Sequence, residues 1–184
     1  MQECNVKTKD PKEDEVNVDF GVTRVGRDEG DRYTVAGALD TIVKVRGEST
    51  GGVVAVAEHI IQPGTLGAPI HTHSREDEIS FVTQGSIGVQ IGDQVFEAGA
   101  GTTVFKPKGI PHAFWNASDS EARFVEVFAP AGLERYFEEL EPLLPADGPP
   151  DLGAMQQLQN RYGLEMEIAS MPELIQRYGL RMPA

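Results

Sequence analysis

The sequence has a single cysteine, few basic residues and no long apolar run, and each shortage excludes a class of protein. The only cysteine is Cys4, so no disulfide can form within the chain. The 16 Lys and Arg residues are outnumbered by 29 Asp and Glu residues, which gives a formal charge of −13. A phosphate backbone or an anionic lipid surface needs a basic patch, so we expect neither nucleic acid nor a membrane as a partner.

The apolar segments are too short to cross a membrane, and the first residues lack the apolar core of a secretion signal. We therefore expect a cytoplasmic protein. A chain of 184 residues can bury one sizeable core. Residues 1–19, rich in Lys, Asp and Glu, predict a flexible arm; residues 20–130 predict a β-barrel domain, and residues 131–184 a helical C-terminal extension.

Short β-type segments separated by Gly, Pro or Asx residues fill the middle of the chain. Gly92 and Asp93 lie between two of them and form a two-residue hairpin signal. Many short strands at even spacing are typical of a sandwich or barrel. The predicted strands are 33–35, 41–45, 53–61, 79–83, 86–91, 94–97, 102–105, 112–116 and 123–128.

The spacing of apolar residues changes after the last of these strands. One amphipathic helix is expected there, with an apolar face of Leu133, Tyr136, Phe137 and Leu140. Two more short helices are predicted to end at Gly163 and Gly179, because glycine is the preferred residue just after a helix. We expect these helices to cover the barrel or a subunit contact rather than to bind a cofactor.

Three of the four histidines form a spaced pattern with one carboxylate. His71 and His73 are two residues apart, so on a strand both rings project from one face. Glu78 lies at an odd offset from them and would point the other way on a continuous strand. A bulge or bend within residues 74–77 is therefore predicted.

His112 follows a turn-rich stretch, residues 106–111, which can deliver it from a neighbouring strand. Three neutral imidazoles and one carboxylate are ligands that Fe, Mn, Ni, Co and Zn ions accept. On an octahedral ion they leave coordination positions free, which favours a site for chemistry over a structural clasp. A His-x-His pair alone is a weak signal, and the two further residues carry the interpretation.

The spacing of these residues resembles the two signature motifs of the cupin family. In the first motif His71, His73, Glu78 and Gly85 match, while Thr65 stands at the leading position usually held by glycine. In the second motif every position matches, namely Gly101, Pro107, Gly109, His112 and Asn116. The resemblance covers residues 33–130 and implies an all-β fold, the cupin double-stranded β-helix (jelly-roll) barrel, here with a short helical extension.

The resemblance implies that His71, His73, Glu78 and His112 bind one divalent transition metal ion. Asn116 is expected to make a structural hydrogen bond. Strand parity adds Ser80 and Val82, which share the face of Glu78, and Phe114, which shares that of His112, as candidate pocket walls. Trp115 and Phe81 have the opposite parity and are expected to pack outside the barrel or in a dimer contact. His59 matches no motif position, and a packed or surface imidazole is expected there.

The whole chain, with one barrel followed by a short helical tail, is similar to small bacterial quercetin 2,3-dioxygenase-like proteins. That likeness implies a metal-dependent dioxygenase for an enolic or phenolic aromatic molecule, with O2 as co-substrate and Glu78 as ligand and general base. Two alternatives remain open: a metal-dependent isomerase, cyclase or lyase of a small oxygenated molecule, and a non-catalytic binding cupin. A homodimer is expected by family analogy.

Overall fold

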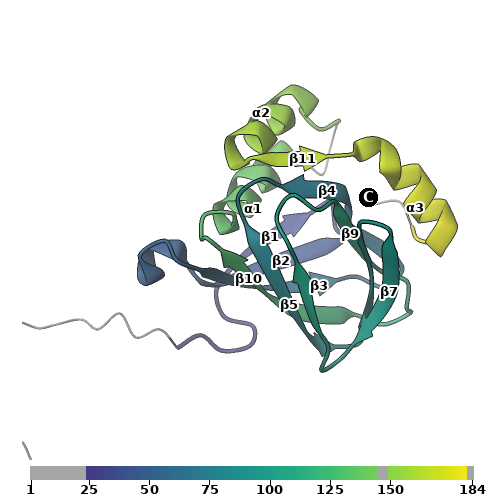
Figure 1. Ribbon diagram of the computed structural model, residues 1–184, viewed down its shortest axis with the longest axis horizontal. Coiled ribbons are helices and arrows are strands. Elements are labelled where there is room, and N and C mark those ends of the chain that lie inside the picture. Colours follow the sequence, from purple (N-terminus) through teal and green to yellow (C-terminus); the bar gives the residue numbers. More distant parts are fainter. Residues whose placement is uncertain (1–23, 145–148, 182–184) are drawn as a thin grey trace, which may run out of the picture.

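The computed structural model describes residues 24–144 and 149–181, and it shows an all-β barrel with short helices gathered at one end (Figure 1). The arm expected at residues 1–19 lies outside the described residues. The barrel is a jelly roll of two antiparallel sheets, one in the order β1-β2-β3-β10-β5-β8 and the other β11-β4-β9-β6-β7.

The first sheet contains β1 (Asp31–Val35), β2 (Leu39–Val45), β3 (Ala55–Ile61), β10 (Ala122–Ala129), β5 (Asp77–Gln84) and β8 (Thr103–Lys106). The second contains β11 (Leu164–Met166), β4 (Thr65–His73), β9 (His112–Asn116), β6 (Ser86–Ile91) and β7 (Gln94–Gly99). Short 3-10 turns occur at Gly47–Thr50, Glu141–Leu143 and Ile168–Ser170.

Alternation of side chains explains why these segments are strands with one face in a core. In β10, Ala122, Phe124, Glu126 and Phe128 are buried, while the residues that alternate with them are partly exposed. The apolar residues of both sheets meet inside the barrel, where they form a core of Leu39, Ile61, Val82, Ile87, Val89, Ala98, Val104, Phe114, Ala122 and Phe124. These side chains fill one end of the barrel, here called the filled end.

Most predicted strands are found near their predicted positions, and β6 and β9 begin and end at the predicted residues. The hairpin at Gly92 and Asp93 is confirmed by the pairing of Ile91 with Gln94. Two of the observed strands, β4 and β11, are not among the predicted ones. The His-x-His spacing indicated only the end of β4, and the three residues of β11 carry no strand signal of their own.

The C-terminal extension contains α1 (Glu134–Leu140), α2 (Leu152–Tyr162) and α3 (Met171–Tyr178). The helix ends predicted at Gly163 and Gly179 are confirmed, with φ of 65° and 64°. The extension is not wholly helical, because β11 lies between α2 and α3 and pairs with the free edge of β4. The chain thus returns to the barrel and adds a strand next to the one that carries His71 and His73.

The three helices pack on different parts of the barrel (Figure 1). Residues of α1 and α2 join the ends of β3 and β10 in a second apolar cluster, which includes Ala55, Phe128, Leu133, Tyr136, Leu140 and Leu158. Helix α3 covers the outer side of β4 and β9, where Trp115 stacks on Tyr178 with ring centroids 4.0 Å apart. Trp115 therefore lies outside the barrel, as its parity predicts.

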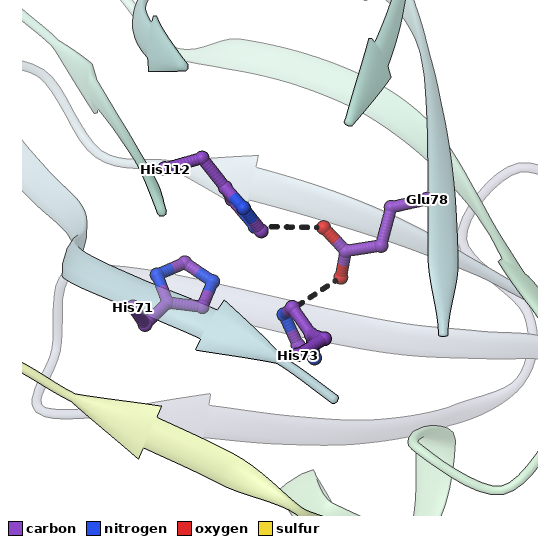
Figure 2. Close-up of side chains that lie close together, drawn as sticks. All are labelled: His71, His73, Glu78 and His112. Atoms are coloured by element: carbon purple, nitrogen blue, oxygen red, sulfur yellow. Dashed lines mark hydrogen bonds and ion pairs between the residues drawn. The ribbon is translucent and has the colours of Figure 1, made fainter. Parts of the chain in front are cut away.

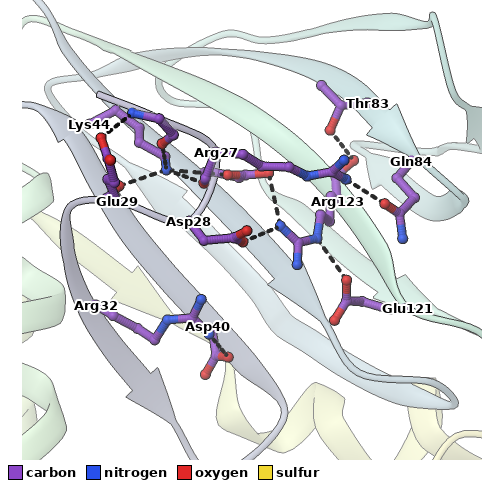
Figure 3. Close-up of polar contacts among 12 residues, drawn as sticks. Arg27, Asp28, Glu29, Arg32, Asp40, Lys44, Thr83, Gln84, Glu121 and Arg123 are labelled. Carbon is purple, nitrogen blue, oxygen red and sulfur yellow. Dashed lines mark hydrogen bonds and ion pairs between the residues drawn. The ribbon is translucent and has the colours of Figure 1, made fainter. Parts of the chain in front are cut away.

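A polar network holds the segment before β1 against the outer face of the first sheet (Figure 3). The ammonium of Lys44 donates hydrogen bonds to the carbonyl oxygens of Gly26 and Glu29, at 3.1 and 2.8 Å. Arg123 donates to the carboxylate of Asp28 at 3.1 Å. These contacts hold residues 26–29 against the sheet. Among the described residues, no helix is both long and apolar enough to cross a membrane.

Candidate metal centre

His71, His73, Glu78 and His112 lie together at one end of the barrel (Figure 2). One donor atom from each of the four residues lies within 4.8 Å of the others. All four side chains are buried, with exposed fractions of 6% or less. Such a cluster of nitrogen and oxygen donors could hold one metal ion.

Both sheets contribute to this cluster. Strand β4 ends at His73, and residues 74–76 form a bend that carries the chain into the opposite sheet, where β5 begins at Asp77. The predicted bend is present. It does not bring Glu78 back to the same face of β4, because it carries the chain into the facing sheet, and Glu78 reaches the cluster from there. His112 lies directly opposite His71 in the β4–β9 pair. The amide of Gly109 donates to the carbonyl of His73 at 2.8 Å, which anchors the turn before His112.

Two of the imidazoles have a fixed orientation. The Nδ1 atom of His71 lies 2.8 Å from the carbonyl oxygen of Pro69, and that of His112 lies 3.0 Å from the carbonyl oxygen of Ile110. A carbonyl only accepts, so each Nδ1 carries a proton, and the Nε2 of a neutral ring then presents a lone pair. In metal sites, such outer hydrogen bonds orient the ligating ring.

When the rings are neutral, their free nitrogens face the carboxylate of Glu78 at the centre of the cluster. The Nε2 atom of His112 lies 3.1 Å from Oε2 of Glu78, and the Nε2 atom of His73 lies 3.3 Å from Oε1 (Figure 2). An unprotonated ring nitrogen and a carboxylate oxygen repel unless a cation or a proton lies between them. Among the described residues, neither ring nitrogen of His73 has a hydrogen-bond partner. Buried polar atoms rarely remain unpaired, so a divalent ion fits this donor set.

The charges favour the same conclusion. Burial lowers the pKa of His71 well below its ordinary value and that of His73 to about 4, so both rings are neutral. Burial raises the pKa of Glu78, but the Lys106 ammonium 2.8 Å away and the neighbouring histidines outweigh it and hold that pKa well below its ordinary value. His71 and His73 are thus neutral imidazoles and Glu78 is an ionised carboxylate, which are the protonation states that metal binding requires.

A buried Lys–Glu pair next to Glu78 is missing from the sequence prediction. The ammonium of Lys106 lies 2.7 Å from Oε2 of Glu126, and the hydroxyl of Ser80 donates to the same carboxylate at 3.0 Å. Burial, reinforced by the charge of Glu78, raises the pKa of Glu126 to about 7 despite the opposing effect of Lys106. The two carboxylates raise the pKa of Lys106 against the effect of its burial, so Lys106 is charged. One cation therefore lies between two buried acids.

A cavity of about 110 Å³, here called the site cavity, is lined by three of the four clustered residues, His71, His73 and Glu78. Its walls are mainly apolar and include Leu39, His59, Phe114, Glu126, Leu133, Tyr136, Phe137, Leu140, Leu164 and Met166. Phe114 therefore lines it, as its parity predicts. Ser80 and Val82 are not among its lining residues, because the Ser80 hydroxyl is bound to Glu126 and Val82 packs in the barrel core.

His59 is buried, with an exposed fraction of 3%, and its ring also forms part of the cavity wall. Its Nδ1 atom lies 3.0 Å from the Thr41 hydroxyl, and its ring packs against Phe124 at a centroid distance of 4.9 Å. Burial lowers the pKa of His59 to about 3, and the nearby Lys106 charge adds to this effect. The sequence allowed a packed imidazole here but did not assign it to the cavity.

His59 is expected to make the metal-free protein less stable in acid. Below a pH of about 6.5 the unfolded chain protonates this ring, while the folded protein keeps it neutral down to about pH 3. Within this range each further pH unit of acidification therefore lowers the free energy of unfolding by up to about 1.4 kcal/mol. Glu126 acts in the opposite direction: its raised pKa means that its protonated form stabilises the fold, and this contribution is lost as the pH rises through about 7.

The variant His59→Leu removes one of these titrations, so we expect its free energy of unfolding to fall less steeply between pH 6.5 and 4. Urea unfolding at several pH values measures the slope. Thr41→Val is the matched control, because it removes the hydrogen bond to the ring and keeps the titrating group. Equal slopes in wild type and His59→Leu would contradict the assignment.

Comparison with known proteins agrees with this geometry. The family model of the cupin domain matches residues 57–128. KdgF from Halomonas sp. has 18% sequence identity and a TM-score of 0.52, with 59% of this chain and 93% of that protein covered. A predicted oxalate decarboxylase from Thermotoga maritima has 19% identity and a TM-score of 0.52, over 59% of this chain and 98% of that one.

A sugar phosphate isomerase of the cupin superfamily from Silicibacter pomeroyi has 21% identity and a TM-score of 0.50, over 58% of this chain and 74% of that one. At these identities the likeness shows the fold alone. No curated protein matches the sequence. Residues 57–128 therefore match a single cupin domain, and the barrel has the fold of solved cupin structures.

Proposed function

We propose that this protein is a metal-dependent enzyme, and that its reaction is the dioxygenation of a small enolic or phenolic aromatic molecule. The observation that supports this most is the position of the four-residue cluster. Two neutral imidazoles of the cluster, His71 and His73, and the carboxylate of Glu78 lie at the wall of an apolar cavity that is lined by aromatic rings. Apolar cavities with a few convergent polar groups are typical of small-molecule sites.

In this proposal, separate residues bind the metal ion, accept the substrate proton and pack against the substrate ring. His71, His73, Glu78 and His112 would hold the ion, which supplies a Lewis acid when bound. Glu78 is ionised and faces the cluster, so it would take the proton of the substrate hydroxyl. Phe114 and Phe137 would hold a flat ring and exclude water. Both atoms of O2 enter the product of a dioxygenase, so the reaction consumes no external reductant.

The size of the site cavity limits the substrate. Apolar cavities of about 150 Å³ bind a molecule of the size of benzene. The site cavity, at about 110 Å³, therefore has room for a head group no larger than one ring, and a three-ring flavonol does not fit within it. We expect small catechols or enolic diketones to be better substrates than flavonols.

A second candidate function is proton transfer without O2, in an isomerase or lyase of a small oxygenated molecule. The observation that favours it is Glu126, whose carboxyl lines the site cavity and has a pKa raised by burial to about 7. A group with a pKa near neutrality is suited to both donating and accepting a proton. Glu126 would then shuttle the proton while the substrate oxygen is held at the cluster.

One experiment separates the two candidates. The protein is reconstituted separately with iron, manganese, cobalt and nickel, and each form is assayed against catechols, enolic diketones and flavonols with an oxygen electrode. We expect O2 uptake in a 1:1 ratio with the loss of a single-ring substrate. The apo protein is the control. Absence of uptake with every metal and substrate would exclude the dioxygenase, and turnover under strict anaerobiosis would assign the second candidate.

A further inference from the structure

A second cavity lies between the barrel and the C-terminal extension. This side cavity has a volume of about 140 Å³. Eight residues line the side cavity alone and are absent from the wall of the site cavity: Ala36, Ala38, Leu66, Leu144, Met155, Gln159, Ile168 and Met171. Every one of them except Gln159 is apolar. Gln159 is hydrogen-bonded to Tyr136, so neither polar group needs a ligand as a partner.

The two cavities share a wall. Six residues line both of them: Val35, Gly67, Pro69, Tyr136, Leu140 and Met166. Met166 belongs to β11 and lies opposite His71 in the β11–β4 pair. The side cavity is therefore adjacent to the strand that carries two of the clustered histidines, and one layer of side chains separates it from the site cavity.

Methionine is unusually frequent in this part of the molecule. Of the five methionines in the chain, Met155, Met166 and Met171 line the side cavity. Methionine has three rotatable side-chain bonds and a polarisable sulfur, and it adapts its shape to apolar ligands at low cost. Met166 is half-buried in the shared wall, and a change of its side-chain rotamer would connect the two cavities.

We propose that the side cavity binds an apolar substituent of the substrate whose oxygen-bearing head group occupies the site cavity. This inference rests on the proposed function, because the clustered residues place the head group. The volume of the side cavity is close to that of cavities that bind benzene, at about 150 Å³. The substrate class is therefore a catechol or enol that bears one short alkyl chain or one additional ring.

The probes that test this are catechol and 4-butylcatechol, titrated into the cobalt-loaded protein and followed by visible absorbance. We expect the butyl chain to tighten binding by about fourfold for each methylene that enters the side cavity. In Met155→Trp the indole fills the side cavity, so catechol should bind as in the wild type and the gain from the butyl chain should be lost. Leu152→Trp is the matched control, because Leu152 lies on the same helix with its side chain exposed, and it should retain the gain.

A second measurement does not depend on the variants. In protein labelled with ¹³C at the methionine methyl groups, 4-butylcatechol should shift the signals of Met155 and Met171, and catechol should not. If catechol binds but the butyl chain neither tightens binding nor shifts these signals, the proposal is overturned and the proposed function stands. If catechol does not bind, the proposed head-group site fails. Butylbenzene added to the metal-free protein then tests the side cavity alone, and unchanged Met155 and Met171 signals would exclude it as an apolar site.

Discussion

Glu78→Gln is expected to lower turnover by about 10²- to 10⁴-fold, the range that a positioned general base contributes. The glutamine keeps the shape of the side chain and loses its negative charge. It removes the only carboxylate of the four-residue cluster and the group that takes the substrate proton. It also leaves Lys106 without one of its two anionic partners. Metal affinity is expected to fall as well, since an amide oxygen is a weaker ligand than a carboxylate.

The measurement is the rate of substrate loss together with the metal content of the same sample, so that loss of the ion and loss of the base are distinguished. Asp77→Asn is the matched control. Asp77 is the neighbouring carboxylate, and it accepts a hydrogen bond from the Lys108 amide at 2.9 Å, which an asparagine can also accept. Unchanged turnover in Glu78→Gln with the ion still bound would contradict the proposed role and favour a non-catalytic binding protein.

Lys106→Met is expected to have the largest effect on stability, a loss of about 3–5 kcal/mol in the free energy of unfolding of the metal-free protein. Lys106 has an exposed fraction of 2%, and its ammonium lies within 2.8 Å of both Glu78 and Glu126. Its removal leaves two buried carboxylates with no cation between them. Because Glu126 can then take a proton, we expect the loss to be larger at pH 8 than at pH 6.

A double-mutant cycle tests whether the cost arises from the uncompensated acids. Glu126→Gln alone leaves Lys106 paired with Glu78 and should cost about 1 kcal/mol, the scale of one hydrogen bond. The double variant should be more stable than the sum of the two single effects predicts, by a coupling of roughly 1–3 kcal/mol. Urea unfolding of all four proteins at one pH measures this. Simple additivity would show that Lys106 contributes by packing and not by charge.

Much of the barrel and the whole four-residue cluster could be predicted from the sequence. Glycine, proline and Asx residues mark most strand ends, and the motif glycines Gly85 and Gly101 both adopt a positive φ, 68° and 91°. The second motif placed Asn116 in a structural role, and its amide donates to the carbonyls of Ile61 and Ser120. These features are predictable because they depend on backbone geometry and on short spacings along the chain.

Parity also contained a signal for the residues that were missed. Lys106 shares its face of β8 with the buried Val104, and Glu126 lies between the buried Phe124 and Phe128. A charged residue at a position where the strand's alternation predicts an apolar side chain points into the core. Because an isolated charge is costly to bury, such a residue indicates a buried ion pair. His59 likewise shares its face of β3 with Ala57 and Ile61.

The depth of a residue along the barrel could not be predicted in this way. Ser80 and Val82 point inward as parity requires, but Val82 lies at the filled end, among Ile87, Val89 and Val104. Alternation gives the direction of a side chain and not its distance from the open end. Nor does the short segment that forms β11 have any pattern of its own, because its pairing with β4 is set by long-range contacts.

That pairing has a consequence for how the molecule behaves among other proteins. An uncovered strand edge offers a row of unpaired amides and carbonyls to any extended chain it meets, and such edges promote aggregation. In this protein β11 pairs with the last three residues of β4 along this edge, with Leu164 opposite His73 and Met166 opposite His71. The strand that presents two of the clustered histidines is therefore shielded from intermolecular sheet formation by the chain itself.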